Sequence, residues 1–271
     1  MKDVDFLIDS IYTRYGYVRR AREMFLYTQK GRLTDLYREG GRAILGWGGN
    51  SAFTMLKDVL SRGATGSYKT QERSRIQKAV SDFLQCPCKV YAFNNKQSAL
   101  EAALNVAPQS TSVYKAWNIS DIDKKNIQAF VLEPPLAWTS DIYIVAFNDS
   151  IENELRLSKV EANFNTCYIS SPISVAICRS FYNLTKAINE LEEKDFFIYD
   201  TILTKYWYRK GPYLYPKPDV INKDLYKDFM LHCLSCSVVI SPIYDIPSIV
   251  PFGADRGVFR ALEKNPFKTS V

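Results

Sequence analysis

The amino-acid sequence predicts an α/β fold. Apolar runs with the two-residue period of β-strands alternate with longer segments in which apolar residues recur every three to four positions, as on an amphipathic helix. Strands and helices that alternate along a chain are typical of a sheet with helices on its faces. The chain has 271 residues, of which 46% are hydrophobic. A chain of this length can bury a core without disulfides or a structural metal.

The first predicted elements are a helix, a hairpin and a loop. Residues 4–15 carry apolar side chains at helical spacing. Residues 24–37 contain two β-rich runs on either side of Gly31, which can take the positive φ of a tight turn, so this segment predicts a hairpin. The thirteen residues 38–50 include five glycines and predict a loop.

The middle of the chain carries most of the alternating signals. Helical periodicity predicts helices over 51–62, 70–85, 97–106 and 173–193. Short apolar runs predict strands at 90–93, 127–133, 142–148, 167–170 and 196–200.

The end of the chain predicts a small second lobe. Residues 201–218 are rich in aromatic residues and proline, and we expect them to form a loop. A strand, an extended proline-bounded segment and a closing helix follow. We therefore place a large domain at 1–223 and a small C-terminal lobe at 224–271.

Charge and hydropathy exclude several classes of partner. The formal net charge is +6, but Lys and Arg are mixed with Asp and Glu, so no basic stripe indicates nucleic-acid binding. No apolar run reaches the roughly 18 residues of a membrane span. Residues 1–10 are amphipathic and acidic, unlike a signal peptide. We expect a cytoplasmic protein.

Two groups of residues have the chemistry of metal ligands. Cys86 and Cys88 form one, and His232, Cys233 and Cys236 form the other. A structural zinc site needs four ligands in closely spaced pairs, which these groups supply only if the fold brings them together. A cysteine within an apolar run usually behaves as a small hydrophobic residue. We expect no metal site.

Several blocks, in order, resemble class III (subgroup II) pyridoxal-phosphate-dependent aminotransferases. They are FLYT, KGRL and LGW within residues 25–47, VYAFNNKQSALEAALNVA at 90–107, AFVLEPPLAW at 129–138 and FFIYDTILTKYWYRKGPYLY at 196–215. The resemblance implies a fold-type-I, three-layer α/β/α sandwich with a small C-terminal α/β lobe. The sandwich would be shortened, because the long segment that the family inserts after the position of residue 107 is missing.

The resemblance also implies pyridoxal 5'-phosphate as a cofactor. By position, Asn95, Lys96, Gln97 and Ser98 would contact its phosphate, because the first turn of a helix offers unpaired N–H groups to an anion. The family has a glycine where this chain has Lys96.

Two charged residues would complete such a site. Asp200 occupies the position of the carboxylate that keeps the pyridine nitrogen protonated. Lys223 is the candidate for the Schiff-base lysine, with Lys227 as the second candidate. From the residues alone, Asp200 can equally cap a turn, and both lysines can equally be solvated charges.

Two functions therefore stay open. The first is a divergent aminotransferase of impaired or unproven activity, acting on a small amino-group-bearing substrate. The second is a catalytically inactive descendant that serves as a binding or assembly module, since the family's carboxylate-binding arginine is replaced within residues 248–252. Because the family completes its site across a dimer interface near the glycine-rich loop 40–49, with its Trp47, we expect a homodimer.

Overall fold

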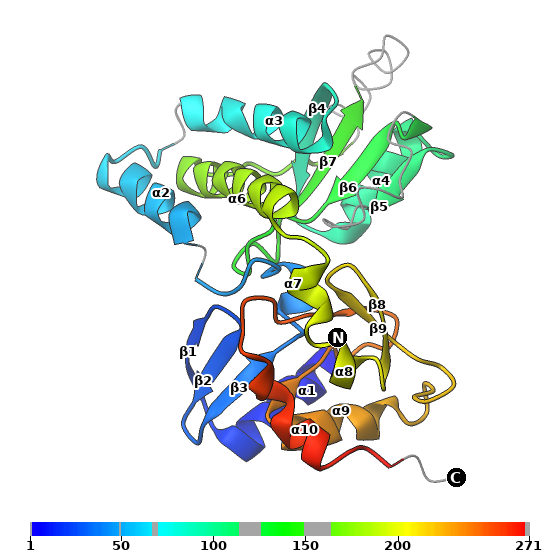
Figure 1. The fold of residues 1–271 in the computed structure, drawn as a ribbon. Helices are drawn as coiled ribbons and strands as arrows, with labels where there is room; N and C mark the ends of the chain where they lie inside the picture. Colours follow the sequence, from blue (N-terminus) through cyan, green and yellow to red (C-terminus); the bar gives the residue numbers. More distant parts are fainter. Residues whose placement is uncertain (1, 49, 67–69, 114–125, 149–163, 269–271) are drawn as a thin grey trace. The chain divides into compact units, whose positions relative to one another are not determined.

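A computed structural model describes residues 2–48, 50–66, 70–113, 126–148 and 164–268 (Figure 1). The chain divides into two units. The terminal unit contains Met1–Gly48 and Leu191–Val271, and the central unit contains Gly49–Glu190. We describe each unit separately.

The central unit is built on a four-stranded sheet. Its strands are β4 (Cys88–Phe93), β5 (Thr111–Val113), β6 (Ala129–Leu132) and β7 (Tyr143–Asn148), in the order β4-β7-β6-β5. β7 runs antiparallel to both β4 and β6, and β5 runs parallel to β6.

Helices cover both faces of this sheet (Figure 1). One face packs on α4 (Lys96–Val106), whose Ala99, Ala102 and Ala103 are fully buried against side chains such as Val145 and Phe147. Small alanine side chains allow the helix to approach the sheet closely. The other side carries α2 (Asn50–Ser61), α3 (Gln71–Leu84) and α6 (Ser171–Glu190). The expected α/β/α layering is thus present.

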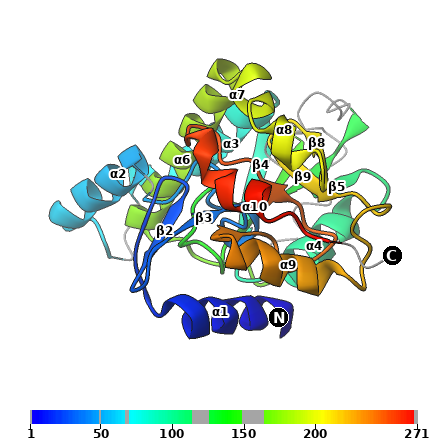
Figure 2. The same cartoon turned by 60° about the horizontal axis from the view of Figure 1, so that its bottom comes forward.

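The terminal unit is built from the N-terminal and C-terminal segments of the chain. Its first sheet has the order β1-β2-β3-β10, with β1 (Val18–Arg22), β2 (Phe25–Thr28), β3 (Arg32–Asp35) and β10 (Val238–Val239). The predicted hairpin is confirmed, and Gly31 has a φ of 153° at its turn. The helix α1 (Lys2–Tyr15) runs beside α9 (Tyr226–Ser235), where the Tyr15 hydroxyl donates to the Leu234 carbonyl at 2.7 Å (Figure 2).

The division of the chain differs from the predicted boundary at residue 223. β10 pairs in parallel with β3, and the backbone N–H of Thr34 and of Leu36 donates to the carbonyls of Ser237 and Val239, each at 2.8 Å. The N-terminal segment therefore forms one sheet with the C-terminal segment.

A second sheet in the terminal unit corrects the loop predicted at 201–218. It has the order β11-β9-β8, with β8 (Trp207–Lys210), β9 (Tyr213–Pro216) and β11 (Ser248–Ile249), all antiparallel. β8 and β9 turn at Gly211, whose φ is 54°. Aromatic residues favour strands. In this segment their preference for strands prevails over the preference of the prolines for loops.

Two predicted strands are wrong. Residues 196–200 span the end of α7 (Lys194–Phe197), a two-residue turn and the start of α8 (Asp200–Leu203). The buried residues are Phe196, Tyr199, Ile202 and Leu203, a helical spacing, whereas Phe197 is 52% exposed. A short apolar run cannot be assigned to strand or helix by its periodicity alone. Residues 167–170 form no strand, although the Cys167 N–H donates to the Ala92 carbonyl of β4.

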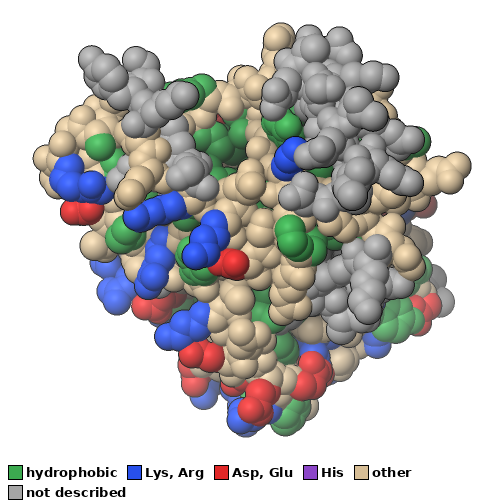
Figure 3. Space-filling view, turned by 90° about the horizontal axis from the view of Figure 1, so that it is seen from above, with side chains coloured by type: hydrophobic (Ala, Val, Ile, Leu, Met, Phe, Trp, Pro, Cys, Tyr) green, Lys and Arg blue, Asp and Glu red, His purple; other side chains and the backbone are tan. Residues whose placement is uncertain are grey.

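The chain ends in a 3-10 turn and a short helix, η4 (Arg256–Phe259) and α10 (Arg260–Lys264), where the sequence predicts a closing helix. Lys and Arg side chains are interspersed with Asp and Glu on the face shown in Figure 3. Within the described ranges, no helix is long and apolar enough to cross a membrane.

Candidate functional site

The predicted site residues are divided between the two units. Residues 95–98 lie at the start of α4 in the central unit, and Asp200, Lys223 and Lys227 lie in the terminal unit. The surroundings of each group within its own unit determine which chemistry it can support.

At the start of α4, a side chain of the protein caps one backbone N–H of the first turn. Asn95 is the N-cap, and its side-chain oxygen accepts a hydrogen bond from the Ser98 N–H at 2.8 Å. Gln97 donates to Glu101 on the next turn of the helix, and the Lys96 ammonium pairs with Glu133 at 3.5 Å. A side-chain cap of this kind satisfies a donor that a phosphate would otherwise use.

Asp200 is held by an arginine. The guanidinium of Arg209, on β8, donates from Nε to Oδ1 at 2.6 Å and from Nη2 to Oδ2 at 2.8 Å. The same guanidinium pairs with Glu193 at 2.5 Å, and the Arg209 side chain is only 9% exposed. The hydrogen bonds that Arg209 donates to Asp200 are the main cause that raises the pKa of Arg209 above its ordinary value, so the guanidinium remains charged.

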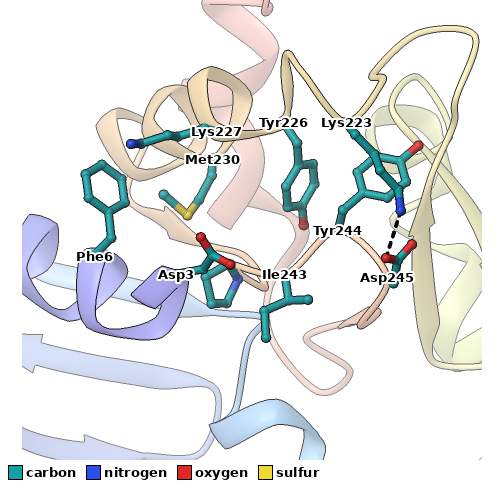
Figure 4. Close-up of a pocket in the computed structure, with 10 residues that line it drawn as sticks. Asp3, Phe6, Lys223, Tyr226, Lys227, Met230, Ile243, Tyr244 and Asp245 are labelled. Carbon is teal, nitrogen blue, oxygen red and sulfur yellow. Dashed lines mark hydrogen bonds and ion pairs between the residues drawn. The ribbon is translucent and has the colours of Figure 1, made fainter. Parts of the chain in front are cut away.

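The two candidate lysines line the same pocket, which has a volume of about 270 Å³ (Figure 4). The Lys223 ammonium pairs with Asp245 at 2.9 Å and lies 5.4 Å from the centre of the Tyr244 ring. The Lys227 ammonium lies 4.0 Å from the centre of the Phe6 ring, a cation–π arrangement.

The pocket has an apolar floor and a charged rim. Tyr226 and Met230 are buried, and the Tyr226 hydroxyl donates to the Ser241 carbonyl at 2.8 Å. Burial raises the pKa of Tyr226, so this hydroxyl stays protonated. Asp3 points toward the middle of the pocket from α1, on the side where Lys227 lies (Figure 4).

Sequence reasoning found only part of this pocket. The resemblance to aminotransferases singled out Lys223 and Lys227, but no local signal marks Asp3, Phe6 or Asp245, which come from the two ends of the chain. The packing of α1 beside α9 brings them together. Asp200, also predicted for the site, is not among the residues that line the pocket.

Within its own unit, each predicted contact for pyridoxal phosphate has a partner from this chain. The cofactor needs an open anion site, a carboxylate for its ring nitrogen and an available amine. Here the Ser98 N–H is capped by Asn95, the Asp200 carboxylate is bound by Arg209, and the Lys223 amine is bound by Asp245. Clusters of three or more His, Cys, Asp or Glu with metal-binding geometry are also absent from the residues that the structure describes.

Comparisons of sequence find relatives without an assigned activity. No family model matches the chain. A protein from Treponema pallidum (strain Nichols) is 24% identical over 294 residues, covering 89% of this chain and 91% of that protein. A protein from Borreliella burgdorferi is 25% identical over 249 residues, covering 89% of this chain and 86% of that protein. Both are described as uncharacterized.

Comparisons of structure identify the fold. Acetylornithine aminotransferase from Elizabethkingia anophelis aligns with a TM-score of 0.64 and 10% identity, over 97% of this chain and 98% of that one. Ornithine aminotransferase from Plasmodium yoelii aligns with a TM-score of 0.59 and 12% identity, over 97% of each chain. Sphingomonas wittichii serine palmitoyltransferase aligns with a TM-score of 0.60 and 9% identity, over 96% of this chain and 94% of that one. The chain therefore has the mixed α/β fold of the pyridoxal-phosphate-dependent aminotransferases.

Proposed function

We propose that this chain is a non-transaminating protein built on the aminotransferase fold, which acts as a binding module. The observation that carries the proposal is the bidentate pair between Arg209 and Asp200. A carboxylate whose two oxygens both accept from one guanidinium is neutralised by it. A protonated ring nitrogen brought to the same carboxylate would meet the positive charge of Arg209.

The pocket of the terminal unit supports binding of a small amino-group-bearing acid. Asp3 offers a carboxylate to an amino group, and Lys227, whose ammonium lies over the Phe6 ring at the edge of the pocket, supplies a positive charge for a carboxylate (Figure 4). Phe6 and Met230 give an apolar surface for the remainder of such a molecule. The ligand class follows from these opposite charges over an apolar floor.

Cofactor labelling tests the first part of the proposal. The protein is incubated with pyridoxal phosphate, reduced with borohydride and analysed by peptide mass spectrometry. We expect Lys223 to be labelled no more than Lys205, an exposed lysine of the same unit. Stoichiometric labelling of Lys223, absent in Lys223→Arg, would refute the proposal.

Calorimetry with apolar amino acids tests the second part. We expect binding that is lost in Lys227→Met and in Asp3→Asn and is retained in Lys205→Met. Absence of binding by wild-type protein contradicts the ligand class while leaving the first part standing, because the labelling experiment is independent of the pocket's ligand.

A divergent aminotransferase is the second candidate function. One observation favours it: Lys227 lines the pocket, and its ammonium rests on an aromatic ring instead of on the carboxylate that binds Lys223. Labelling that is confined to Lys227 and stoichiometric would support this second candidate over our proposal.

A further inference from the structure

Cys86 and Cys88 form a thiol pair in the central unit. Their sulfur atoms are 3.4 Å apart, at the turn between α3 and β4. A disulfide bond is about 2.05 Å long, so the two atoms must approach by roughly 1.4 Å to form one. A small movement of the two side chains would therefore bring the sulfur atoms to bonding distance.

The backbone N–H groups of both cysteines donate hydrogen bonds to Ser81. The Cys86 N–H donates to the Ser81 carbonyl at 3.2 Å, and the Cys88 N–H donates to the Ser81 hydroxyl at 3.1 Å. Gln85, with a φ of 58°, ends α3 immediately before the pair. Pro87 stands between the cysteines, and its ring restricts the backbone there. Their separation is therefore set by the fold.

The two thiols differ in their access to solvent. Both line a cavity of about 510 Å³ together with Ser81, Asp82 and Gln85, but Cys88 is only 2% exposed whereas Cys86 is half-buried. Thiol–disulfide exchange uses such an asymmetry, because an accessible thiol makes the first attack and a protected thiol resolves the mixed disulfide.

At the other four cysteines, burial disfavours the thiolate form. Burial raises the pKa of Cys178 to about 12 and raises that of Cys233 well above its ordinary value. Burial also raises the pKa of Cys167 and of Cys236. A protonated thiol is a poor nucleophile. With two sulfur ligands, the Cys86–Cys88 pair also supplies only half of the four that structural zinc requires.

The geometry points to Cys86 and Cys88 as a thiol–disulfide exchange site whose substrates are small disulfides. The Cys86 sulfur attacks one sulfur of the substrate, the substrate S–S bond breaks, and the first thiol leaves with the proton of Cys86. The Cys88 sulfur then attacks Cys86, the mixed disulfide breaks, and the second thiol leaves with the proton of Cys88. The protein loses two electrons and two protons, and the substrate gains them.

The test uses the reduced chain of 271 residues with oxidised glutathione as the substrate. After acid quenching and alkylation, peptide mass spectrometry reports the state of each cysteine. We expect Cys86 and Cys88 to lose alkylation together and to be joined in one peptide, while Cys233 and Cys236 stay alkylated. Full alkylation of Cys86 and Cys88, or equal oxidation of all six cysteines, would overturn the assignment.

Two variants separate the roles of the thiols. Cys88→Ser should accumulate a mixed disulfide between Cys86 and glutathione, because the resolving thiol is gone. Cys86→Ser should accumulate far less adduct, because Cys88 is buried. Equal adducts in both variants contradict the asymmetry.

A trivalent arsenical gives a readout that needs no oxidation. One equivalent of phenylarsine oxide should bind the folded wild-type protein through both sulfurs, and each single variant should lose this binding. Retained binding in either variant would show that the thiols do not act as a pair.

Discussion

At the scale of single residues, the pairing of Asp200 with Arg209 determines how the candidate site is interpreted. We predict that Arg209→Ala lowers the free energy of unfolding by about 2 kcal/mol, because it leaves Asp200 without its charged partner. Urea denaturation measures the change. Arg209→Lys is the matched control, since it keeps the charge but loses the fork geometry, and it should fall between wild type and alanine. Equal stability of all three proteins would show that the pair is not an established contact.

The residue scale also shows what a sequence can predict of a site. Lys223 and Lys227 were found from their position in a block, and the structure places both on one pocket. The sequence does not predict the charged partners of Lys223 and Asp200. Asp245 follows Lys223 by 22 positions and Arg209 follows Asp200 by 9, and neither pairing leaves a local pattern. A salt bridge of this kind depends on how separate elements pack, which periodicity does not report.

At the scale of elements, strands and helices with long periodic patterns were predicted well. The helices α2, α3, α4 and α6 and the strands β4, β6 and β7 agree with the sequence prediction. The errors fall on short segments. Residues 196–200 have too few positions for their period to separate a strand from a helical turn. In the structure Tyr199 is the buried centre of this segment, with its hydroxyl donating to the carbonyls of Pro251 and Ala254 at 2.9 and 2.5 Å.

The hydroxyl of Tyr199 gives a test of this helical segment. Tyr199→Phe should destabilise the protein by about 1 kcal/mol, because two carbonyls lose their donor in a buried place. Tyr208→Phe is the control, since Tyr208 is 54% exposed and its hydroxyl lies 3.5 Å from Asp219. Thermal unfolding of both variants decides the matter. If the two melting temperatures change equally, Tyr199 is not docked as described.

At the scale of the whole molecule, the predicted homodimer remains a prediction. Its sequence argument used Trp47, whose indole N–H donates within the chain to Asp35 at 2.8 Å. This hydrogen bond gives Trp47 a role within the chain. The bond uses the indole N–H and leaves the ring faces for contact with a second copy. Light scattering at micromolar concentration should report a dimer. A monomeric mass at that concentration contradicts the prediction.

The division into units leads to a sharper prediction for the whole molecule. The sequence places residues 25–35 in one domain and Val239 in another, whereas β10 completes the sheet of β2 and β3. Val239 is 1% exposed, so Val239→Ala leaves a small cavity and should cost about 2 kcal/mol. Elements that unfold as one cooperative unit exchange their amide hydrogens together.

Hydrogen exchange therefore distinguishes the two divisions of the chain. In Val239→Ala, we expect faster exchange in β2 and β3 as well as in β10, and unchanged exchange in β4 and β7. The matched variant Val145→Ala, at a fully buried position in the central unit, should give the opposite pattern. If Val239→Ala speeds exchange only after residue 223, the boundary predicted from the sequence is the better description, because the N-terminal hairpin would then be stable without the strand that the C-terminal segment adds to it.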